Sequence, residues 1–295
     1  MNTPELEVSF GAKPSKKDRR DIPARKVLVK SSGFRPAKYK IDYSSHIHLY
    51  QKKLGVCTAA ALVQLIEKKR GDGVKLSVRF LYNVGKHFID MNLDEGSSLR
   101  TMLKAAYKYG VATEASVPSD FSLSHAEFVS KIDFPASIWE EALQYRIPGY
   151  ARVNLELDNL QDVILSENAG IYSRVEVGKE WYTDKNGIPT WSSVALLPLR
   201  TPKRVESGHA IGVVGFDSSV VGKDLIEFRN TWSDRWADNG DGRFYYKEYH
   251  PKYFTECWVI TDSPQEAPSL LQIAVWRMED LILLIKKYVI KSFSL

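Results

Sequence analysis

The stretch QKKLGVCTAAALV, residues 51–63, places a cysteine where a glycine-containing turn leads into an apolar, alanine-rich segment typical of a buried helix. Cys57 would stand at the N-terminus of that helix, where the positive end of the helix dipole favours a thiolate. The thiolate is the nucleophilic form of cysteine, so this position suits a nucleophile. Gln51, six positions earlier, carries a side-chain N–H that can donate to a developing oxyanion.

Two later stretches supply the groups that such a nucleophile needs. His209 lies in SGHAIGVVGFD, residues 207–217, at the start of an apolar strand pattern, and Asn230 lies in FRNTWSDRW, residues 228–236. A histidine on a neighbouring strand can take the thiol proton, and an amide can hold the imidazole in one orientation. The indole of Trp232 can shield that imidazole–amide hydrogen bond from water. Cysteine, histidine and asparagine in this order predict an enzyme with a cysteine nucleophile.

The segments QxxxGxC, GHA and NTW resemble the three active-site blocks of papain-like cysteine peptidases, and the similarity runs from about residue 21 to residue 262. The sequence LGVCTA around the nucleophile is similar to the prokaryotic and viral branch of that family. The resemblance implies an α+β fold of two lobes, one helical and one antiparallel and β-barrel-like, with the active site in the cleft between them. It also implies that substrate backbone approaches Gly96 closely and that Trp232 contributes to the substrate site.

Four positions depart from the family's pattern without removing a catalytic group. Gly208 stands before the histidine where some members carry aspartate, and Val56 replaces a usual serine before the nucleophile. Ser233 and Ala237 replace glycines that follow the two tryptophans of the asparagine block. These departures leave the reaction rate and the substrate preference open.

Hydrophobic periodicity divides the chain into three parts. Residues 1–40 form a basic arm with little periodicity, residues 41–262 form the catalytic domain, and residues 263–295 form a broadly apolar helical extension. Within the catalytic domain, helical patterns fill about 50–148 and alternating strand patterns fill about 149–262. Helices first and strands afterwards favour an α+β organisation.

Both terminal segments have two interpretations. The arm is favoured as a plain leader, and the alternative is an arm that covers the cleft and is displaced or clipped for activation. The C-terminal helix is favoured as packing on its own domain or on a second copy of the chain. The alternative is that this helix lies on a membrane surface. It is not expected to span a membrane, because charged residues interrupt it too often.

Composition narrows the classes of function. With 41 basic and 36 acidic residues the net charge is only +5, which does not imply nucleic-acid binding. A bridge between the two cysteines, Cys57 and Cys257, would inactivate the nucleophile, so we expect no disulfide and a reducing, cytoplasmic location. No secretory signal is visible at the N-terminus, although a signal-independent export route stays open. The cysteines and histidines show no metal-ligand spacing, and the expected chemistry needs no cofactor.

These patterns predict a cysteine-type endopeptidase that hydrolyses protein or peptide substrates through a thioester on Cys57, with His209 as general base and then general acid. Acyl transfer, deamidation or peptide ligation on the same Cys–His–Asn site is one alternative, and a catalytically silent papain-like binding module is another. Substrate side-chain preference, endopeptidase against exopeptidase action, and the oligomeric state are left open by the sequence.

Overall fold

The computed structural model describes residues 6–262, apart from residues 19–20, 27, 29–34, 131, 184–185, 187, 189 and 192–196. The expected C-terminal helix at 263–295, with both of its interpretations, lies outside the described residues. Within them, no helix combines the length and the apolar character needed to cross a membrane.

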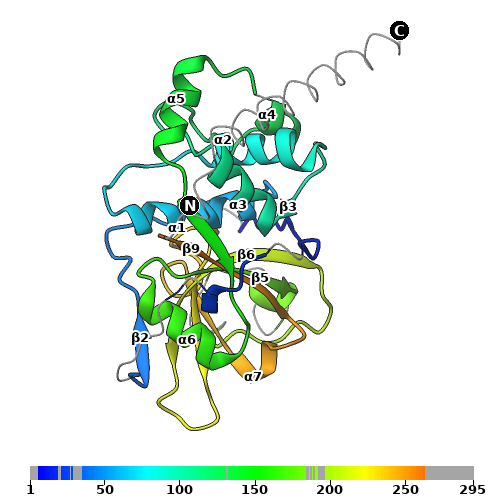
Figure 1. Ribbon diagram of the computed structural model, residues 1–295. Helices are drawn as coiled ribbons and strands as arrows, with labels where there is room; N and C mark the ends of the chain where they lie inside the picture. The colour runs from blue at the N-terminus through cyan, green and yellow to red at the C-terminus, as the bar shows by residue number, and fades with distance from the viewer. Residues whose placement is uncertain are drawn as a thin grey trace.

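Helices fill the first lobe, on one side of the molecule (Figure 1). Ser77 and Ser98 begin two of them, because each hydroxyl accepts a hydrogen bond from a backbone N–H three residues later. The most buried helix is enclosed over residues 57–66, which explains why its sequence is apolar without a single stripe. The helices are α1 (Cys57–Arg70), α2 (Val78–Val84), the π-helical η2 (Gly85–Asp90), α3 (Leu99–Lys108), α4 (His125–Ser130) and α5 (Ala136–Gln144).

An antiparallel sheet fills the second lobe, with the order β4-β9-β5-β6-β7-β8 and with β2 paired to β6. Over the described residues β4 and β8 are the two free ends of this path, so the lobe expected to be barrel-like is an open sheet rather than a closed barrel. Its strands and short helices are β2 (Lys38–Lys40), β4 (Gly149–Arg152), α6 (Leu157–Ser166), β5 (Ile171–Val177), η3 (Lys179–Trp181), β6 (Ser207–Asp217), β7 (Leu225–Arg229), β8 (Asp241–Tyr245), α7 (Tyr246–Tyr249) and β9 (Phe254–Thr261).

The two lobes join where α1 packs on β6. A Cβ on Gly212 would lie 3.0 Å from a methyl carbon of Leu65, so the missing side chain allows the helix to approach the strand closely. The Tyr172 hydroxyl donates to the Thr58 carbonyl at 2.6 Å, which fixes β5 to the first turn of α1. This packing places the N-terminus of α1 against the beginning of β6.

Part of the basic arm belongs to the folded structure. Its strand β1 (Ala12–Lys13) pairs in parallel with β3 (Ser97–Ser98) of the helical lobe, with Ala12 opposite Ser97. A further turn of the arm, η1 (Ala24–Lys26), begins beside Pro23, which bridges to β4. These residues are not the plain leader that we favoured from the sequence, because their backbone pairs with distant strands that local patterning does not reveal.

Candidate functional site

The candidate nucleophile is the first residue of α1. Cys57 is fully buried, and backbone groups of Ala210, Thr58 and Gly11 lie close enough to lower the pKa of its thiol. Since Ala210 directly follows the candidate base, the sulfur lies against the strand that carries His209. The sequence placed these two residues in different lobes, and the structure brings them together across the interface.

The candidate base and its orienting residue form one hydrogen bond. His209 Nε2 lies 2.7 Å from Asn230 Oδ1. An amide oxygen only accepts hydrogen bonds, so Nε2 carries the proton and Nδ1 keeps a free lone pair. Nδ1 has no hydrogen-bond partner among the described residues, which leaves it able to accept a proton.

Aromatic rings enclose this pair. The Trp232 ring lies 4.7 Å from the His209 ring, centroid to centroid, and Trp181 meets the imidazole edge-on at 6.3 Å. Both indoles are fully buried. Their burial beside the imidazole–amide pair leaves little room for water at that bond. A contribution of Trp232 to the substrate site stays a prediction. Trp181 was not predicted, because it lies in the short turn η3, whose sequence carries no pattern.

Gln51 has a side chain held at both ends. Its Oε1 accepts a short hydrogen bond from the Thr231 hydroxyl, and its Nε2 donates to the Leu54 carbonyl at 2.8 Å. Thr231 follows Asn230 directly, so the same loop positions the candidate oxyanion donor and the orienting amide. Nε2 also donates to the Ser9 carbonyl of the arm at 3.1 Å. That second acceptor shows that the amide can reach a peptide carbonyl in the site.

Burial sets the protonation of the site. Desolvation raises the pKa of the Cys57 thiol from 9.0 to about 12, although backbone hydrogen bonds lower it. Desolvation also lowers the pKa of His209 from 6.5 to about 4, against an upward effect of the Asn230 hydrogen bond. The sequence led us to expect a thiolate at the helix N-terminus. In this structure burial favours the neutral thiol and the neutral imidazole, because both charged forms lose their contact with water.

Gly96 lies beside the backbone of the arm, and the approach of substrate backbone that we expected there stays a prediction. Its φ is +79°, and a Cβ there would lie 2.6 Å from the Gly11 carbonyl oxygen. Lys86, fully buried, supports this edge by donating from Nζ to the Gly96 carbonyl at 2.9 Å and to Asp90 at 3.2 Å. Lys86 had no sequence signal, because a lysine in a helical pattern is usually solvated.

No cluster of three or more histidine, cysteine, aspartate or glutamate side chains in the described part of the chain could hold a metal ion. Both cysteines are free, and Cys257 is buried with its sulfur 3.2 Å from the Ser173 hydroxyl.

Comparisons with known proteins agree with this geometry. No family model matches the chain. An uncharacterized peptidase C1-like protein of Acanthamoeba polyphaga mimivirus is 23% identical over 297 residues, covering 89% of each chain. Xylellain, a cysteine protease from Xylella fastidiosa, superposes with a TM-score of 0.72 at 21% identity, over 88% of this chain and 98% of that one. Digestive procathepsin L 3 of Tenebrio molitor gives a TM-score of 0.60 at 17% identity, over 85% and 75%. The chain therefore has the papain-like fold, and these solved structures that share it are cysteine proteases or their precursors.

Proposed function

We propose that the chain is a cysteine peptidase that hydrolyses peptide bonds in protein or peptide substrates. The observation that carries the proposal is the His209–Asn230 hydrogen bond of 2.7 Å, which leaves Nδ1 free in a site that also holds the Cys57 sulfur. The papain-like fold and the names of the similar proteins support the same class of reaction. Structural likeness at this identity shows the fold, so the activity rests on the site.

The proposed reaction uses the thiol, the imidazole and two N–H donors in turn. Nδ1 of His209 accepts the thiol proton while the Cys57 sulfur attacks the scissile carbonyl carbon. The backbone N–H of Cys57 and Nε2 of Gln51 donate to the resulting oxyanion. The imidazolium then gives its proton to the leaving amine, which leaves a thioester on Cys57. His209 next deprotonates a water molecule, and the hydroxide attacks the thioester to release the acid and regenerate the thiol.

The test is covalent labelling combined with hydrolysis. A thiol-alkylating epoxide should modify Cys57 of the purified full-length protein and abolish cleavage of a peptide library. Cys257→Ala is the matched control, because that buried thiol lies outside the site and its loss should leave both labelling and cleavage unchanged. Cleavage that survives in Cys57→Ala would refute the proposal. Acyl transfer to an added amine that outruns hydrolysis would identify a transferase on the same thioester.

A further inference from the structure

We propose that Arg229 is a positioning residue, which holds Gln51, Asn230 and the helix of Cys57 in register through the hydrogen bonds of its buried side chain. The inference rests on the proposed peptidase function and deepens it. Arg229 is the last residue of strand β7, directly precedes Asn230 and is only 3% exposed. Its side chain bonds residues beside the reacting groups, so it acts on the reaction through them.

Each of the three guanidinium nitrogens of Arg229 donates to a different partner. Nε donates to Gln64 Oε1 at 2.9 Å, Nη1 to His48 Nε2 at 2.8 Å and Nη2 to the His46 carbonyl at 2.6 Å. These three hydrogen bonds are here called the Arg229 fork. Because the guanidinium group is planar and rigid, it fixes the directions of its donors relative to one another. The fork therefore sets the position of segment 46–48 relative to helix α1, which carries Gln64.

The segment held by the fork continues into the proposed oxyanion donor. Gln51 N donates to the Thr231 carbonyl at 3.0 Å, and one residue earlier Tyr50 forms an antiparallel bridge with Trp232. This segment is thus fixed at two places, by the Arg229 fork at one and by the loop after strand β7 at the other. Gln51 takes its position from both.

The Nε arm of the fork reaches the helix of the nucleophile and the orienting amide. Gln64 follows Cys57 by seven residues, or about two helical turns, so the two side chains leave α1 on the same face. While Gln64 Oε1 accepts from Arg229, Gln64 Nε2 donates to the Asn230 carbonyl at 3.4 Å. One side chain therefore connects α1 both to the fork and to the residue that orients the imidazole.

The fork requires a neutral His48. A guanidinium group only donates hydrogen bonds, so His48 Nε2 presents a lone pair and Nδ1 carries the proton. Burial lowers the pKa of His48 from 6.5 to about 4, and the charge of Arg229 lowers it too, which agrees with the neutral form. Gly240 has a φ of +86°, and a Cβ there would lie 2.4 Å from Nδ1. A glycine in the facing turn thus leaves room for the imidazole.

The charge of Arg229 is balanced at the edge of the fork. Asp241 Oδ1 lies 3.9 Å from Nη1, while Asp241 Oδ2 pairs with Lys40 Nζ at 2.9 Å. The guanidinium carbon also lies 4.8 Å from the centroid of the Tyr43 ring. Desolvation lowers the pKa of Arg229, and Asp241 opposes that effect. A lysine at this position would keep the charge, but its single ammonium group could not donate along the three directions of the fork.

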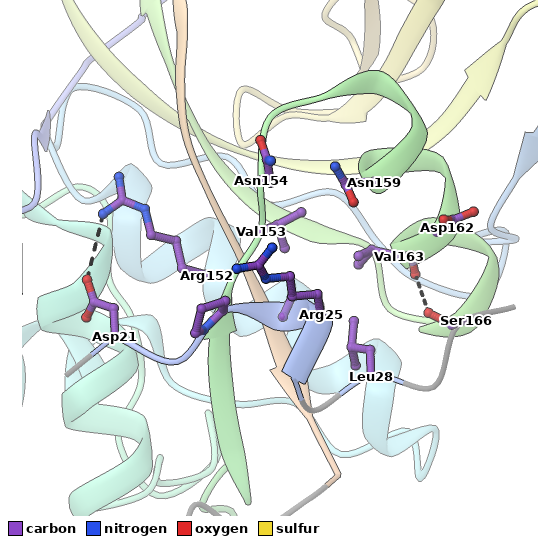
Figure 2. A pocket seen from close by; sticks show the side chains of 12 residues that line it. Asp21, Arg25, Leu28, Arg152, Val153, Asn154, Asn159, Asp162, Val163 and Ser166 are labelled. Carbon is purple, nitrogen blue, oxygen red and sulfur yellow. Dashed lines mark hydrogen bonds and ion pairs between the residues drawn. The ribbon is translucent and has the colours of Figure 1, made fainter. Parts of the chain in front are cut away.

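The first test compares Arg229→Lys with the matched control Arg25→Lys in the full-length chain. Arg25 is exposed and lines a cavity whose side chains, shown in Figure 2, are not those of the fork. Hydrogen exchange read by mass spectrometry should become at least about tenfold faster over 46–51 and 229–233 in Arg229→Lys, because these segments open more easily. Exchange over β5 should stay within about twofold, and Arg25→Lys should match wild type. Unchanged exchange in folded Arg229→Lys would overturn the inference.

A double-mutant cycle then asks whether Arg229 acts through Gln51. Arg229→Lys should lower kcat about 10²-fold and leave KM within about threefold, since a displaced oxyanion donor is lost mainly from the transition state. In a Gln51→Ala background the same substitution should lower kcat about tenfold or less, because the donor that it displaces is already gone. A merely structural role predicts equal decreases in the two backgrounds, and that result would overturn the inference.

A second pair of variants serves if Arg229→Lys does not fold. His48→Gln keeps an acceptor near the place of Nε2, whereas His48→Met removes it at similar volume. Exchange over 46–51 should rise at least about fivefold in His48→Met and stay within about twofold of wild type in His48→Gln; equal exchange in both would overturn the inference. If wild type hydrolyses no peptide, the proposed function fails, while the exchange results still decide whether Arg229 holds these segments.

Discussion

Asn230→Ala removes one oxygen on which two buried donors depend. Asn230 Oδ1 accepts from His209 Nε2 at 2.7 Å and from Thr231 N at 2.8 Å. Each orphaned buried donor costs about 1–3 kcal/mol. The substitution also removes Asn230 Nδ2, which is buried without a partner among the described residues, and this returns part of the loss. We expect the free energy of unfolding to fall by about 2–3 kcal/mol.

Urea unfolding with linear extrapolation measures this change, and the slope with urea should match that of wild type. Asn154→Ala is the control, because Asn154 is exposed and accepts one hydrogen bond from Glu156 N at 3.2 Å. Its loss should cost about 1 kcal/mol or less. If Asn230→Ala destabilises the protein no more than Asn154→Ala does, the two hydrogen bonds do not have the importance that their geometry indicates.

The same substitution should affect the reaction mildly. Without Asn230 the His209 ring loses the acceptor that fixes its tautomer, while its Nδ1 and Cys57 remain in place. The loss of one hydrogen bond of about 0.5–1.5 kcal/mol lowers kcat by about three- to tenfold. A decrease in kcat as large as that of His209→Ala would show that Asn230 does more than orient the ring.

Three further predictions concern the reaction and its protonation. Cys57→Ser and His209→Ala should each lower kcat on the order of 10⁴-fold or more, with circular dichroism unchanged, and hydrolysis near the wild-type rate would contradict the assignment. Gln51→Ala should lower kcat about 10²–10³-fold and leave KM nearly constant, so a change confined to KM would exclude an oxyanion role. In wild type, the free energy of unfolding should fall from pH 6.5 towards 4 more steeply than in His209→Gln. The folded His209 pKa of about 4 lies below 6.5, so the unfolded chain takes up the proton first; equal slopes would contradict this.

The elements that carry the predicted site could be found from the sequence because each has a strong local signal. The apolar run after Cys57 predicted a helix with Cys57 at its N-terminus, which is α1 (Cys57–Arg70). The apolar run after His209 predicted a strand that starts near this residue, and it lies within β6 (Ser207–Asp217). Long runs of apolar residues in the sequence indicate buried elements. The α+β class and the order of the two lobes could therefore be predicted from them.

The contacts of residues 9–12 with the two lobes could not be predicted from the sequence because the arm makes them with its backbone. Residues 9–12 show neither strand nor helix periodicity, and their partners Gln51, Ser97 and Gly208 lie far along the chain. Main-chain hydrogen bonds leave no pattern in side-chain type. The prediction of a Cys57 thiolate was wrong for the same reason. The helix N-terminus was readable, but the segment that removes water from the thiol was not.

Burial keeps both reacting groups neutral. Raising the pKa of a thiol from 9.0 to about 12 costs the thiolate about 4 kcal/mol, and the depressed pKa of His209 penalises the imidazolium in the same way. The backbone of Gly11 lowers the pKa of the Cys57 thiol and so offsets part of this cost. A reactive thiolate–imidazolium pair therefore needs water or substrate dipoles beside it, which burial of the two groups removes.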